Sequence, residues 1–86
     1  MNVQAADTTL QGTRCAIVVV SPDLVANSGE ADMAIERLRP TFGGAPVVLM
    51  AQKDDGSPVY YGDQDLVEAL RGVPLEDLPW QEYRVR

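Results

Sequence analysis

The chain has 86 residues with 13 acidic and 7 basic side chains, a net charge of −6, one cysteine and no histidine. This length allows one small domain with a thin core, and no apolar run approaches the roughly 20 residues of a membrane helix. The usual zinc and copper sites lack ligands, and the bases do not cluster, so we expect no metal, no cofactor, no nucleic acid and no membrane partner.

The N-terminal segment is mostly polar and shows no period. Its composition predicts a flexible N-terminal tail over residues 1–13, followed by a single small α/β domain over residues 14–86. The same segment lacks the basic start and apolar run of a signal peptide. We therefore expect a cytoplasmic location.

Two apolar runs predict neighbouring buried strands. The first is CAIVVV at 15–20, and the second is PVVLMAQ at 46–52. Between them, Asn27 and Glu30 have the spacing of a capping box, and apolar residues at helical intervals predict a helix over 28–39. A helix that joins two strands of one sheet makes those strands parallel.

A hairpin signal follows the second run. Asp55 and Gly56 lie between apolar segments, which predicts a two-residue turn. This turn would place Met50 opposite Tyr61. Pro58 follows the turn and lacks an amide hydrogen, so the returning strand is expected at the edge of the sheet.

The last third of the chain predicts a second helix and a closing strand. Asp65 and Glu68 again have capping-box spacing, and Gly72 marks the helix end. A proline-bracketed connector then allows one short 3₁₀ turn at 75–78. Alternation over residues 81–86 predicts a half-buried edge strand.

These elements predict an α/β, or α+β-like, two-layer sandwich of order β-α-β-β-α-β. Its mixed sheet would have three or four strands, with two helices that can both lie on one face.

A resemblance suggests an alternative fold. Ala45-Pro46 before a strand, a hairpin, Gly62 and then Asp65-Leu66 at a helix start resemble the C-terminal half of glutaredoxins and other thioredoxin-like proteins. The resemblance implies a minimal thioredoxin-like arrangement. At the place of that family's Cys-x-x-Cys pair this chain has Ser21-Pro22-Asp23-Leu24, so redox chemistry is not implied.

Both faces of the two central strands are apolar. If the helices share one side, the other side stays bare, and a large bare patch marks an interaction site. We therefore predict a non-enzymatic interaction or assembly module that forms a homodimer or binds a protein partner. The expected interface residues are Val48, Met50, Tyr60 and Tyr61. Alternatively, the tail and the 73–80 connector cover this face.

Two other functions stay open. A small-molecule-binding or anion-binding domain, with or without enzymatic activity, would use the loop after the first strand and the second helix start. Its candidate residues are Ser21, Asp23, Asn27, Ser28, Gly29, Asp63 and Asp65. No catalytic residue is assigned. The acidic C-terminal half could also serve as a decoy for a basic partner.

Overall fold

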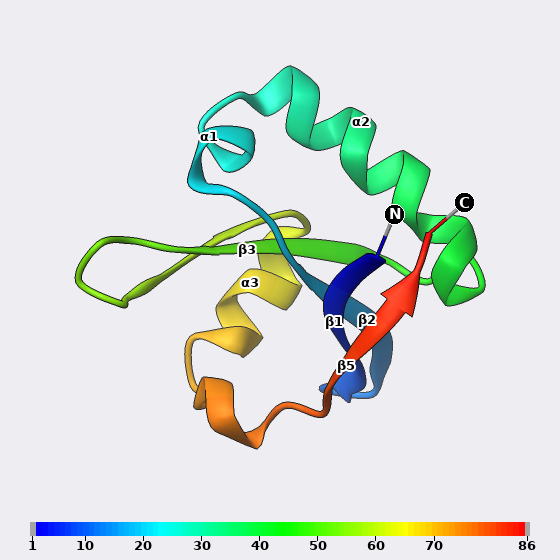
Figure 1. Ribbon diagram of the computed structural model, residues 1–86. Helices are drawn as coiled ribbons and strands as arrows, with labels where there is room; N and C mark the ends of the chain where they lie inside the picture. Colours follow the sequence, from blue (N-terminus) through cyan, green and yellow to red (C-terminus); the bar gives the residue numbers. More distant parts are fainter. Residues whose placement is uncertain (1, 86) are drawn as a thin grey trace.

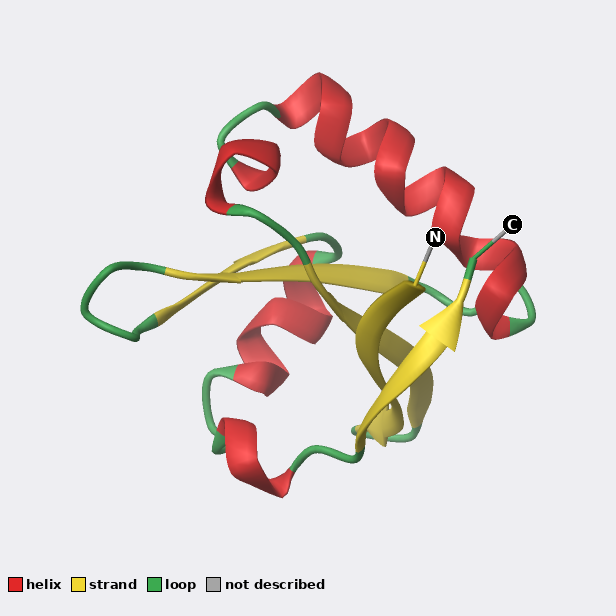
Figure 2. Cartoon of the chain, viewed as in Figure 1, coloured by secondary structure: helices red, strands yellow, loops and turns green. Residues whose placement is uncertain are grey.

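The computed structural model describes residues 2–85 and shows a mixed α+β fold with a five-stranded sheet (Figures 1 and 2). Short 3₁₀ turns lie at Arg39–Phe42 and Leu75–Asp77. The strands and helices, in chain order, are β1 (Asn2–Leu10), β2 (Thr13–Val19), α1 (Pro22–Val25), α2 (Ser28–Leu38), β3 (Val47–Gln52), β4 (Pro58–Tyr61), α3 (Gln64–Leu70) and β5 (Trp80–Arg84).

The N-terminal segment is a strand, so the prediction of a flexible tail is wrong for residues 2–10; residue 1 lies outside the described residues. β1 turns at Gln11 and Gly12, whose φ angles of 49° and 80° suit a tight hairpin, and pairs antiparallel with β2. Ala5 and Ala6 are fully buried on opposite faces of the sheet. The strand is hard to predict because its most buried side chains are small.

The sheet has the order β4-β3-β2-β1-β5. It therefore has five strands, where three or four were predicted, because β1 adds a strand between β2 and β5. β2 and β3 are parallel, as predicted, and the other neighbouring pairs are antiparallel. β4 and β5 form the two edges, so the prediction of edge positions for the returning and closing strands is confirmed over the described residues; residue 86 lies outside them.

Helices cover both faces of the sheet, so the arrangement with both helices on one face is wrong. α1 and α2 pack on the face that carries Ala16, Val18 and Leu49, whereas α3 packs on the opposite face against Ile17 and Val48. Figure 1 shows α2 above the sheet and α3 below it. The reason lies after β4, where the chain turns at Gly62 and passes to the face that α2 leaves uncovered. The apolar sheet is thereby buried within the protein itself.

The β3–β4 hairpin differs from the predicted register by one residue. Met50 lies opposite Tyr60, and Leu49 lies opposite Tyr61. The turn contains one residue more than predicted, since the amide of Lys53 donates to the carbonyl of Ser57 at 2.9 Å and Gly56 takes a φ of 86°. A three-residue loop with glycine in the left-handed region is a common hairpin connection.

Candidate functional site

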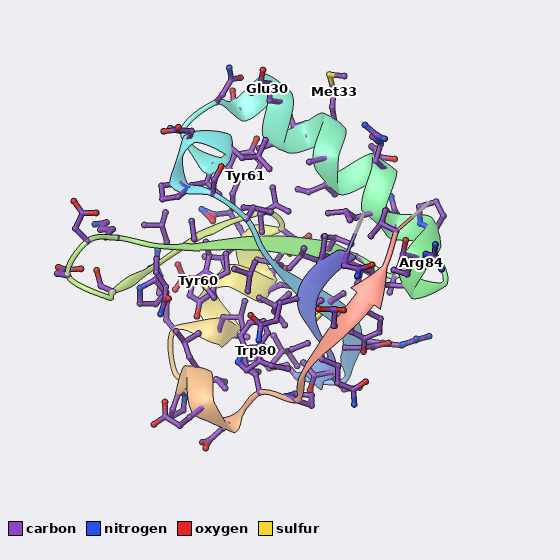
Figure 3. The ribbon with its side chains drawn as sticks, viewed as in Figure 1. Glu30, Met33, Tyr60, Tyr61, Trp80 and Arg84 are labelled. Atoms are coloured by element: carbon purple, nitrogen blue, oxygen red, sulfur yellow. The ribbon has the colours of Figure 1, made fainter. Side chains whose placement is uncertain are left out.

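The helix α2 carries the one exposed large apolar side chain of the described residues, that of Met33. Asn27 starts this helix by accepting a hydrogen bond from the Glu30 amide at 3.2 Å. Ala31 and Leu38 face the core, which turns Met33 outward. Met33 is 69% exposed and is the single exposed large hydrophobic residue among those described. Figure 3 shows its side chain pointing away from the sheet, near Glu30.

Two opposite charges flank Met33 on this helix. Glu30, Met33, Ala34 and Arg37 follow one another at intervals of three, one and three residues, so they share one side of α2. Within residues 2–85, the ion pairs are Asp7–Arg14, Glu36–Arg39 and Glu68–Arg71. The charged groups of Glu30 and Arg37 therefore have no partner among the described side chains, and both are exposed.

An open groove of about 460 Å³ adjoins these residues. It lies between α2, α1, β1, the end of β2 and the residue that follows β5. Glu30, Met33 and Arg37 contribute to its rim. Its lining is mainly apolar and includes Val3, Val19, Val20, Leu24, Leu38 and Val85. Ala34 is half-buried and packs against the core, so Glu30, Met33, Ala34 and Arg37 form one flank of α2. We call this flank and the adjoining groove the α2 surface.

The predicted ligand-binding residues do not form one site. Ser21 lines the groove of the α2 surface, and Asp23 lies in the first turn of α1. Asn27 caps α2, the helix in which Ser28 and Gly29 lie.

The remaining two predicted ligand residues lie at the start of α3, in the layer on the other face of the sheet. Asp63 caps α3 by accepting hydrogen bonds from the amides of Asp65 at 2.9 Å and Leu66 at 3.3 Å. The prediction that Asp65 is the cap is therefore wrong by two residues. Asp65 instead lies in the first turn of α3.

Two of the four predicted interface residues are buried. Val48 is fully buried and Met50 is 4% exposed, because α3 covers the sheet face on which they lie. Their predicted exposure is wrong.

The two tyrosines of β4 lie on opposite faces of the sheet and are half-buried (Figure 3). The hydroxyl of Tyr61 donates a hydrogen bond to Asp32 Oδ1 at 2.8 Å. This bond, with smaller contributions from burial and from the Asp32 charge, raises the pKa of Tyr61. Burial alone raises the pKa of Tyr60.

Sequence reasoning missed Met33, although the sequence contains a signal for it. The apolar stripe Ala31, Ile35 and Leu38 defines the buried side of α2, and Met33 falls off that stripe between charged residues. A large apolar residue on the polar side of a helix departs from the expected pattern. Methionine is also common on surfaces that adapt to partners, because its side chain is flexible and polarizable.

The described residues define a small mixed α+β protein with an exposed apolar helix surface. Within residues 2–85, no group of three or more His, Cys, Asp or Glu side chains is placed to hold a metal ion. No helix in this part of the chain is both long and apolar enough to cross a membrane. Comparisons with protein-family models, curated proteins and solved structures give no match.

Proposed function

We propose that the protein is a non-enzymatic interaction module that self-associates through the α2 surface. The observation that carries this proposal is the position of Met33, which is 69% exposed and lies between the unpaired charges of Glu30 and Arg37. The proposal keeps the function expected from the sequence but moves the interface. A bare sheet face cannot be the interface, because helices cover both faces of the sheet.

A second copy fits this surface by symmetry. When two α2 helices pack antiparallel around a two-fold axis between Met33 and Ala34, Glu30 of each copy comes level with Arg37 of the other. Met33 then comes level with Ala34, a large side chain against a small one. In a two-fold interface the same patch must complement itself. The order Glu30, Met33-Ala34, Arg37 meets this condition, because each end of the patch carries the charge opposite to the other end.

The adjoining groove supports the same proposal. Its apolar lining is open to solvent beside α2, and a second copy seated on the helix can cover part of it. Burial of apolar surface would supply most of the binding energy. The two pairs of opposite charges would mainly fix the antiparallel orientation.

Charge reversal tests this interface. We expect size-exclusion chromatography with light scattering to show a wild-type dimer. Glu30→Arg and Arg37→Glu should each weaken it by at least about tenfold, because each substitution places like charges opposite each other twice. The double variant Glu30→Arg/Arg37→Glu should restore the dimer, since it exchanges the two charges without changing their pairing.

Arg84→Glu is the matched control. Arg84 is exposed, lies on β5 and makes no ion pair within the described residues, so its reversal should leave the dimer intact. A monomeric wild type at all concentrations, or a double variant no tighter than the single variants, would contradict the proposal. Loss of the dimer on Arg84→Glu would indicate pairing through the β5 edge instead.

A small-molecule-binding domain is the second candidate function. The groove's volume falls within the range of about 300–1,000 Å³ typical of ligand pockets, and Ser21 and Leu24, which follow β2, contribute to its lining. The loop after β2, which the sequence suggested for ligand binding, therefore contributes to the lining of this candidate pocket. Such a domain should stay monomeric in the light-scattering experiment and keep its mass in every α2 variant.

The thioredoxin-like alternative contributes nothing to either candidate. It concerned fold alone, and the sheet order β4-β3-β2-β1-β5 is the arrangement on which the proposal rests. The one cysteine, Cys15, is buried in the core, and no reaction is assigned to it.

A further inference from the structure

A second groove lies on the opposite side of the sheet from α2. It has a volume of about 530 Å³ and runs between β4, α3 and the connector that follows α3. Its apolar lining includes Val59, Val67, Leu70 and Leu75. Unlike the groove of the α2 surface, it also has a substantial polar lining.

The polar lining of this groove includes the only bases of a long acidic stretch. Between residues 40 and 83 the sequence contains two basic residues, Lys53 and Arg71, and both line the groove. They come from different elements, one at the end of β3 and the other at the end of α3. Tyr60, on β4, lines the groove as well. The fold therefore brings two cations and a phenol together over an apolar floor.

Both cations are available to a ligand. Lys53 makes no ion pair within the described residues. Arg71 contacts Glu68 at 2.9 Å, but the two side chains are 65% and 59% exposed, and such exposed pairs contribute little to stability. The nearby carboxylate of Asp55 accepts hydrogen bonds from the amide and hydroxyl of Ser57, at 2.9 and 2.6 Å, and attracts Lys53 without forming an ion pair with it.

We infer that this groove binds a small organic anion with an apolar body. The anionic group, a carboxylate, sulfonate or phosphate, would lie near Lys53 and Arg71, and the apolar body would cover the half-buried side chains of Val59 and Val73. Pockets for small molecules commonly combine an apolar lining with a few polar groups that fix orientation. Arginine suits such an anion because its planar guanidinium donates two parallel hydrogen bonds.

Tyr60 supports the same chemistry. Burial raises its pKa, so the hydroxyl keeps its proton at neutral and mildly alkaline pH. Its side chain packs against the core under α3, which limits its motion. It can therefore offer a donor to an anion at this end of the groove.

The test uses two fluorescent probes of similar shape. 8-Anilinonaphthalene-1-sulfonate carries a sulfonate, and N-phenyl-1-naphthylamine has the same aromatic body without the charge. We expect the sulfonate to bind the wild type at least about tenfold more tightly than the neutral probe. Amide chemical-shift changes on adding the sulfonate should map to β4, the end of α3 and the connector after it.

Variants then test whether the two cations of this groove carry the binding. Lys53→Gln/Arg71→Gln should weaken sulfonate binding at least about tenfold and leave neutral-probe binding unchanged, whereas Arg84→Gln, which removes an exposed charge that lines neither groove, should change neither. Circular dichroism should show that each variant folds. The inference is overturned if the sulfonate does not bind, if the two probes bind equally, or if the shifts map to α2. None of these outcomes depends on whether the protein dimerises.

Discussion

At the scale of single residues, Tyr61 joins two elements that are distant in the sequence. Its hydroxyl lies 2.8 Å from Asp32 Oδ1 and 3.4 Å from the carbonyl oxygen of Ser28. Residue 61 belongs to the edge strand β4, and both acceptors belong to α2. The bond therefore holds the helix that carries Met33 against the sheet edge.

Removal of this hydroxyl should lower the stability of the protein. We expect Tyr61→Phe to reduce the urea midpoint at neutral pH, because Asp32 loses its donor. Tyr60→Phe is the matched control, one residue earlier on the same strand, since its hydroxyl makes no hydrogen bond within the described residues. Equal midpoints for the two variants would show that the bond contributes nothing.

The effect of Tyr61→Phe should also depend on pH. The hydrogen bond to Asp32 raises the pKa of Tyr61 in the folded state, so the folded protein holds this proton more tightly than the unfolded chain. Its contribution is complete below the ordinary tyrosine pKa of about 10 and is lost as pH rises through the folded-state value. The difference between wild type and Tyr61→Phe should therefore shrink in strong alkali, as followed by denaturation at several pH values.

At the scale of elements, the long apolar runs predicted their strands correctly, whereas shorter patterns shifted the β3–β4 register by one residue and the cap of α3 by two. The long apolar runs of β2 and β3 and the cap of α2 at Asn27 are visible in the sequence because several neighbouring residues favour the same structure. β1 is not, since Ala5 and Ala6 have low strand propensity. Its position depends on pairing with β2 and with β5. The strand β5 lies at the other end of the described chain, so a local pattern cannot reveal this pairing.

Gly62 lies at the turn between β4 and α3 and is closely packed against β3. A side chain at this position would meet the carbonyl oxygen of Val47 and the Cα of Val48, each at 3.2 Å, and the φ of 155° is unfavourable for other residues. The strand β4 ends at Tyr61, and the cap residue Asp63 follows Gly62 directly. Gly62 thus approaches the backbone of β3 at the point where the chain leaves β4 and enters α3.

Gly62→Ala should destabilise the protein by about 1–3 kcal/mol, the usual cost of a strained backbone site. Urea denaturation would measure this change in the free energy of unfolding. Gly72→Ala is the control, because its nearest neighbouring atom would lie at 4.0 Å and its φ is ordinary. A Gly62→Ala variant as stable as Gly72→Ala would show that the turn tolerates a side chain.

At the scale of the whole molecule, the apolar surface is distributed differently from the sequence-based prediction. That prediction compared the apolar area of two strands with the area that two helices on one side could cover. It omitted β1, which extends the sheet, and it did not place α3 on the second face. The exposed apolar residue is consequently on a helix, at Met33, and Val48 and Met50 are in the core.

The candidate site was predictable only in part. Ser21 was selected for its place after a buried strand, and it does line the groove of the α2 surface. Arg37 and Val85 also line that groove, but no local pattern connects a helix residue with a chain end. Lys53 and Arg71 likewise meet at one groove only through the arrangement of β4 and α3. Such sites depend on tertiary contacts, which local periodicity does not encode.

The most direct measurement of the central claim is an isotope-filtered nuclear Overhauser experiment on a mixture of methyl-labelled and unlabelled protein. Self-association through the α2 surface predicts an intermolecular signal between the ε-methyl of Met33 and the β-methyl of Ala34. Intermolecular signals confined to β5, or none at concentrations where light scattering shows a dimer, would contradict it.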